Sequence, residues 1–167
     1  MRKLIALLGA AGNGIGRLEE AAGMALIVAM AVVVNLQVFA RYLFHAPFIW
    51  PEEVVRLILV WLTFLASAAL TRRGADIAVD TFVDMMPARA RRAFLVARDM
   101  VLTVLFAWLA LQGWWLAGSV ADMPLVATEW PTSLLAWPVA IGGGLIAFHA
   151  ATRLLGTLFA DREGMAR

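Results

Sequence analysis

Four apolar stretches of about 20 residues, with charges only near their ends, constrain this chain more than any other feature. They cover residues 18–40, 52–71, 98–120 and 132–153 of the 167. A helix that crosses a bilayer needs roughly 20 mostly apolar residues. Overall 63% of the residues are hydrophobic and 16% are charged, whereas soluble domains are about half apolar and about a quarter charged. The sequence therefore predicts a single all-α integral membrane domain, residues 1–167, with four transmembrane helices.

The basic residues are distributed unevenly between the two ends of these helices. All but two of the 14 Lys and Arg residues lie before the first span, between the second and third, or after the fourth. Positive charge is concentrated in the segments that stay in the cytoplasm, so both termini and the middle loop are predicted to be cytoplasmic. Five tryptophans gather at the opposite, outer ends, as in an aromatic belt: Trp50, Trp114, Trp115, Trp130 and Trp137. A net charge of +2 gives no indication of nucleic-acid binding.

Two shorter segments predict helices that lie along the membrane surface. The N-terminal segment "MRKLIALLGAAGNG" has a basic start and a short apolar stretch, and is expected to be a retained interfacial helix rather than a cleaved signal peptide. In the middle loop, Asp76, Asp80 and Asp84 share one helical face and apolar residues take the other. This is the pattern of an amphipathic interfacial helix. A solvated loop with chance spacing is the alternative.

The sequence contains neither cysteine nor the common catalytic motifs. The chain has no cysteine, which excludes disulfides, thiol catalysis and Cys-ligated metals. No catalytic or phosphate-binding motif is present, and "GNGIG", Gly12–Gly16, does not follow a predicted strand. His45 and His149 are predicted at opposite ends of the membrane, so they cannot share a metal or a haem iron. We expect no enzyme activity, metal or cofactor in this chain.

The segment "WPEEVVR", residues 50–56, has the pattern of a helix start at the outer membrane surface. Pro51 suits the first helical turn, and Glu52 and Glu53 complement the positive end of the helix dipole. Arg56 is spaced for an intrahelical ion pair with either glutamate. Charged residues within membrane helices usually face protein or water. We therefore predict a charge cluster that is buried or semi-buried against another helix or another protein; its residues are Arg41, Trp50, Glu52, Glu53 and Arg56.

Residues 41–80, "RYLFHAPFIWPEEVVRLILVWLTFLASAALTRRGADIAVD", resemble the signature of the small membrane (Q-type) subunit of tripartite ATP-independent periplasmic (TRAP) transporters. That family shows Arg-aromatic-x-Phe, then Pro, then Trp-x-Glu-Glu-x-x-Arg. The matching residues here are Arg41, Tyr42, Phe44, Pro47, Trp50, Glu52, Glu53 and Arg56. A basic-Gly-x-x-Ile-x-Val-Asp ending follows at the predicted cytoplasmic end, matched by Arg73, Gly74, Ile77, Val79 and Asp80.

The resemblance implies a role in transport across the bacterial inner membrane. In this family the small subunit pairs with a large permease subunit, which carries the sodium and substrate sites and moves substrate by an elevator-type motion. The small subunit enlarges the static scaffold and contacts membrane lipid. A periplasmic binding protein captures an organic acid and docks on the outer face of both subunits. Sodium coupling is accordingly expected in the large partner and not in this chain.

Span four contains three consecutive glycines, Gly142, Gly143 and Gly144. Small residues spaced four apart let transmembrane helices approach closely, so these glycines are predicted to serve helix packing. Glycine triplets also unwind helices and expose carbonyl groups, so a backbone ion site is the alternative.

Each group of polar residues near the span ends has a structural and a functional interpretation. Asn35 and Gln37 are expected to hydrogen-bond between helices, with substrate contact as the alternative. Glu19 and Glu20 are expected to cap the start of span one, with proton coupling as the alternative. The second outer loop carries acidic residues but no basic ones, and either contacts a periplasmic partner or is simply solvated; its acidic residues are Asp122 and Glu129.

Two other functions are alternatives to a TRAP transporter subunit. An autonomous four-helix exporter acting as a homodimer would need a carboxylate in the middle of the membrane, and the four spans offer none. An anchor subunit of a respiratory enzyme that binds haem would need two histidines on one side of the membrane.

Overall fold

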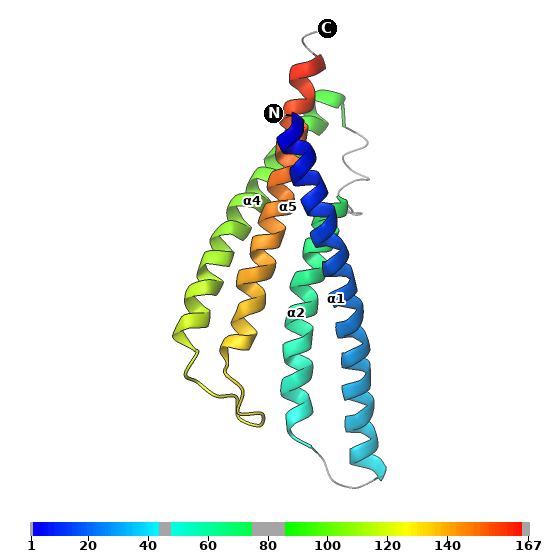
Figure 1. The fold of residues 1–167 in the computed structure, drawn as a ribbon, viewed down its shortest axis with the longest axis vertical. Helices are drawn as coiled ribbons and strands as arrows, with labels where there is room; N and C mark the ends of the chain where they lie inside the picture. The colour runs from blue at the N-terminus through cyan, green and yellow to red at the C-terminus, as the bar shows by residue number, and fades with distance from the viewer. Residues whose placement is uncertain (1, 44–47, 75–85, 165–167) are drawn as a thin grey trace.

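The computed structural model describes the chain apart from residue 1 and residues 44–47, 75–85 and 165–167. The described residues form four long helices (Figure 1): α1 (Arg2–Leu43), α2 (Trp50–Arg73), α4 (Ala88–Ser119) and α5 (Ser133–Gly164). Each contains a segment long and apolar enough to cross a membrane. The predicted all-α membrane fold with four spans is confirmed, and each predicted span lies inside a helix to within one residue.

Helix α1 is longer than the predicted first span. The sequence predicts a separate interfacial helix at the N-terminus, but the structure shows one continuous helix from Arg2 to Leu43. The segment before Gly12 is rich in Leu, Ala, Arg and Lys, which are strong helix formers that offset the cost of the glycines that follow. The amphipathic segment predicted around Asp76, Asp80 and Asp84 lies outside the described residues, as does His45.

Both ends of α2 follow from local sequence. The helix begins at Trp50 with Pro51 in its first turn, followed by Glu52 and Glu53. It ends at Gly74, whose φ of 65° is in the left-handed region and whose backbone N–H donates to the carbonyls of the last turn. Glycine adopts this conformation without a Cβ penalty. The glycine of the family signature therefore has a structural role as the C-cap of α2.

The helices are arranged as two pairs in the shape of a narrow V. Helix α1 packs along α2, α4 packs along α5, and α2 and α5 join the two pairs, while α1 contacts α5 over a short stretch only. Figure 1 shows the pairs together at the end that carries both termini and apart at the other end. Below, the first is called the termini end and the second the loop end. Helix α5 contacts all three other helices and is the most buried of the four spans.

Glycines determine how closely α5 approaches its neighbours. A Cβ on Gly113 of α4 would lie 2.6 Å from the backbone nitrogen of Ala140 in α5. A Cβ on Gly142 would overlap the Phe64 side chain on α2, so the two cannot coexist without movement. Gly143 faces the α4 backbone at Phe106 and Ala110, whereas Gly144 faces open space. In the glycine triplet, consecutive positions thus face different neighbours of α5.

Candidate functional site

At the loop end, Glu53 connects the start of α2 to the loop between α4 and α5. Its carboxylate accepts hydrogen bonds from the backbone N–H of Ala127 and of Thr128, both at 2.9 Å. The Thr128 hydroxyl donates to the same carboxylate at 2.8 Å. These bonds cross the gap between the two helix pairs, so Glu53 fixes the position of a loop more than 70 residues away in sequence.

The loop that Glu53 holds has an internal structure of its own. Met123 and Thr132 are bonded through the N–H and the hydroxyl of Thr132, at 2.8 and 2.7 Å. The Leu125 N–H donates to the Trp130 carbonyl at 2.7 Å. Between them the chain turns through Glu129, whose φ of 57° is uncommon for a residue other than glycine. At the tip Val126 is 96% exposed. The loop therefore presents an apolar side chain on a backbone that is held in place by hydrogen bonds; we call it the braced loop.

The other members of the predicted outer cluster are exposed. Arg41, Glu52 and Arg56 are exposed, Trp50 is half-buried, and no ion pair joins the three charged residues within the described part of the chain. Glu53 turns instead toward the loop. In the chain by itself, the cluster therefore consists of one engaged carboxylate and three charged side chains at the surface.

The termini end is held by ion pairs between α1 and α2. Glu20 of α1 pairs with Arg72 and with Arg73 of α2, the second at 2.8 Å. Arg72 also donates to the side-chain oxygen of Asn13 at 3.4 Å. A Cβ on Gly16 would overlap the Arg72 side chain. The glycine-rich "GNGIG" segment therefore makes room for an arginine from the neighbouring helix, and Arg73 of the family signature contributes to the same contact.

A buried pair connects α1 to α5 at the same end. The His149 Nε2 lies 2.9 Å from Oε1 of Glu19, and both side chains are only 2% exposed. Gly12 lies against the His149 ring. Since α1 and α5 touch over a short stretch only, this pair is their principal polar contact among the described residues. His149 is engaged by a carboxylate, which is a structural use of the imidazole.

A third polar contact joins α4, α5 and α2. Asp99 of α4 has a 3% exposed side chain and lies 3.0 Å from Arg98 and 3.4 Å from Arg153 of α5. Arg153 also donates to the Thr71 carbonyl, near the end of α2, at 2.8 Å. Sequence reasoning missed Asp99; the available signal was a lone acid at the start of a span, directly after an Arg-rich segment. All four helices are thus joined by polar contacts at the termini end.

The comparisons with known proteins agree with this architecture. The family model described as "Tripartite ATP-independent periplasmic transporters, DctQ component" matches residues 30–160. The sialic acid TRAP transporter small permease protein SiaQ of Vibrio cholerae is 22% identical over 140 residues, which is 84% of this chain and 81% of that protein. A putative TRAP transporter small permease protein of Haemophilus influenzae is 23% identical over 81% of this chain and 84% of its own length.

A further match is to a much longer protein. The sialic acid TRAP transporter permease protein SiaT of Haemophilus influenzae is 31% identical over 78 residues, which is 47% of this chain but only 13% of SiaT. A segment similar to this chain is therefore part of one large permease polypeptide in that organism. Together with the match over residues 30–160, these findings show that the chain belongs to the DctQ family, the small membrane component of tripartite ATP-independent periplasmic transporters.

Proposed function

We propose that this chain is the scaffold subunit of a sodium-coupled TRAP transporter for organic acids, in which a separate large permease subunit carries the ion and substrate sites. The family assignment carries this proposal. The SiaT match supports the pairing, because it places a segment similar to this chain within a larger permease polypeptide. The relatives named for sialic acid favour an acidic sugar as the transported substrate.

The distribution of charge supports a scaffold over an ion-coupling role. Residues 21–40, 57–71, 100–121 and 130–152 contain no Asp, Glu, Lys or Arg. Ion-coupling and proton-relay groups in membrane proteins are typically ionisable residues within the span. The middle of each span in this chain is free of such residues, which supports coupling in the partner rather than in this chain.

The loop end is the surface that we assign to docking of the periplasmic binding protein. It presents the braced loop with exposed Val126 and Met123, together with the exposed charges of Glu52 and Arg56. A preorganised loop loses little conformational entropy on binding. This assignment places the loop end in the periplasm and both termini in the cytoplasm of a bacterial inner-membrane protein, as the positive-inside rule predicts.

Reconstitution tests the function directly. The tagged chain is expressed with and without a large TRAP permease subunit from the same organism, and both are extracted in mild detergent and placed in proteoliposomes. We expect a stable complex, and uptake of an acidic sugar that needs the binding protein, a sodium gradient and both membrane subunits. Uptake by the large subunit and binding protein alone would contradict the scaffold role, and flux through this chain alone would favour an autonomous exporter.

Orientation has its own test. Because the chain has no cysteine, single cysteines placed at Val126 and at Gly14 can be labelled with a membrane-impermeant maleimide in spheroplasts. We expect labelling at residue 126 and not at residue 14, and the reverse result would overturn the proposed topology.

A further inference from the structure

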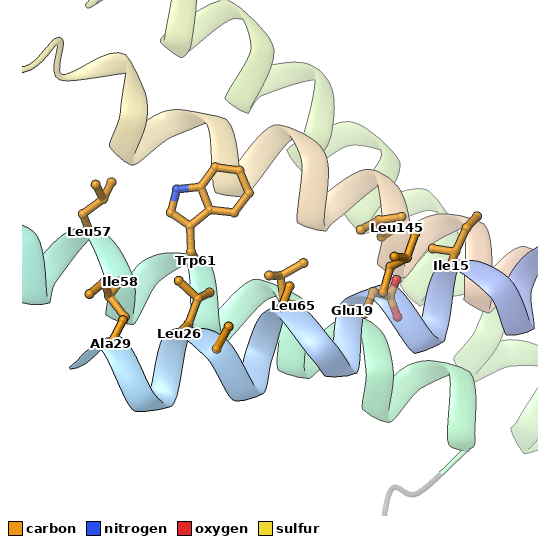
Figure 2. Close-up of a pocket in the computed structure, with 12 residues that line it drawn as sticks. Ile15, Glu19, Leu26, Ala29, Leu57, Ile58, Trp61, Leu65 and Leu145 are labelled. Carbon is orange, nitrogen blue, oxygen red and sulfur yellow. The ribbon is translucent and has the colours of Figure 1, made fainter. Parts of the chain in front are cut away.

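A groove that is open to the outside of the chain runs along α1, between α1 and α2 (Figure 2). Its volume is about 710 Å³. Helix α1 contributes Ala22, Ala25 and Ala29, and α2 contributes Ile58, Trp61 and Leu65. Small residues on one helical face allow another helix to approach closely. The groove extends from Ile15 to Ala29, about 21 Å along α1 at 1.5 Å per residue, and so follows the direction of the span.

One polar side chain interrupts this apolar lining. Glu19 lines the groove near the end where Leu145 of α5 approaches it (Figure 2). Its Oε1 is bonded to His149, while its Oε2 is buried and has no hydrogen-bond partner among the described residues. A buried acceptor that is left without a donor is destabilising, and more so when the group is charged. The site therefore lacks one hydrogen-bond donor.

The need for a hydrogen-bond donor distinguishes between two occupants of the groove, a lipid acyl chain and a transmembrane helix. An acyl chain fills apolar space but cannot donate a hydrogen bond, whereas a transmembrane helix can bring a hydroxyl, amide or basic side chain to a fixed depth. The small side chains of Ala22, Ala25 and Ala29 allow such a helix to approach α1 closely. In SiaT, a segment similar to this chain is part of a far longer permease polypeptide, so large-permease helices are available as neighbours.

We propose that the groove between α1 and α2 receives a transmembrane helix of the large permease subunit, which donates a hydrogen bond to Oε2 of Glu19. This inference rests on the proposed function, because it identifies where the scaffold holds its partner. It also gives the Glu19–His149 pair a second role, since His149 holds Oε1 and thereby fixes the orientation of a carboxylate that lines the groove.

Filling the groove tests the contact. Ala25 and Ala107 are both exposed on the outside of the described chain, on α1 and α4 respectively, but only Ala25 lines the groove. Each is replaced by leucine, and the amount of large subunit retained on the tagged chain is measured in mild detergent. We expect Ala25→Leu to lower retention at least tenfold and Ala107→Leu to leave it unchanged, with unfolding temperatures of both isolated variants close to that of the parent. Equal retention by the two variants would overturn the proposal.

A second variant tests the hydrogen bond to Glu19. Replacing both members of the buried pair, Glu19→Leu with His149→Leu, removes the unsatisfied oxygen without leaving a lone buried charge. We expect the isolated double variant to stay folded, by circular dichroism, and to retain several-fold less large subunit because the donor on the partner loses its acceptor. Full retention by this folded variant would refute the role of Glu19.

Photo-cross-linking distinguishes a helix from a lipid in the groove. A photoreactive maleimide is attached to Ala25→Cys in the complex, with Ala107→Cys as the matched control, and the adducts are identified by mass spectrometry. A large-subunit peptide cross-linked from position 25 supports the proposal. A phospholipid adduct at position 25, in a complex that still co-purifies, would refute the groove assignment and leave the proposed function intact. Failure of the parent chain to retain any large subunit would overturn both.

Discussion

Replacing Gly113 with alanine gives the sharpest test of how α4 and α5 pack. The added Cβ would lie 2.6 Å from the Ala140 nitrogen and 3.0 Å from the carbonyl carbon of Val139. Ordinary van der Waals contact begins near 3.4 Å, so the two helices must separate locally by about 0.8 Å. The obstacle is backbone, which cannot rotate away as a flexible side chain would. The packed interior responds to such a change with strain.

Gly118 on the same helix is the matched control, because a Cβ there meets nothing within 4 Å. Both substitutions exchange a helical glycine for alanine, which by helix propensity alone favours the folded state by about 1 kcal/mol. Overpacking typically costs about 1–3 kcal/mol. Because the propensity term cancels between the two variants, we expect Gly113→Ala to be less stable than Gly118→Ala by about 1–3 kcal/mol.

Unfolding of the purified chain in detergent measures this difference. The Trp114 and Trp137 rings lie on α4 and α5, 5.2 Å apart and nearly perpendicular, so near-ultraviolet circular dichroism and tryptophan fluorescence report on this interface. We expect a lower unfolding midpoint and a changed aromatic signal for Gly113→Ala only. If the two variants unfold at the same midpoint, the close approach of α4 and α5 described here is incorrect.

Three further predictions concern other contacts. Gly142→Ala should lower stability by about 1–3 kcal/mol through its clash with Phe64, whereas Gly144→Ala, which faces open space, should not; equal unfolding midpoints would contradict the packing. His149→Leu should cost about 3–5 kcal/mol because it leaves Glu19 buried without its partner, and adding Glu19→Leu should restore most of the loss in the same unfolding assay. Glu53→Ala should release the outer loop and speed its cleavage by an added protease; an unchanged cleavage rate would show that the loop holds its position without that carboxylate.

The features that sequence reasoning predicted are those encoded by neighbouring residues. The spans depend on runs of apolar residues, and the start of α2 depends on a proline followed by two glutamates. Both are readable without knowledge of the fold, and the structure reproduces them. The continuous α1 was not predicted, because the basic start and short apolar stretch of the N-terminal segment were interpreted as a separate interfacial helix. The small size of Gly12 and Gly16 in this part of α1 serves contacts with His149 and Arg72 from other helices.

The contacts that sequence reasoning did not predict join residues far apart in the chain. Glu19 and His149 are separated by 130 positions, and Glu53 reaches the loop 74 and 75 positions away. A local sequence pattern cannot predict such pairings, because they depend on how the helices are arranged in the folded chain. Each member of the Glu19–His149 pair looked ordinary by itself, a possible cap and a lone imidazole, until the fold placed them together.

The polar contacts at the termini end also impose an order on biosynthesis. Helix α5 is synthesised after the other three helices, yet it carries His149 for Glu19 of α1 and Arg153 for Asp99 of α4. Until α5 is made, Glu19 of α1 therefore lies in the membrane without His149, and Asp99 of α4 has Arg98 but not Arg153. We expect a nascent chain stopped after residue 132 to be degraded faster than the full chain in a pulse-chase experiment, and equal lifetimes would contradict this. We therefore expect the lifetime of the subunit in the cell to depend on completion of α5.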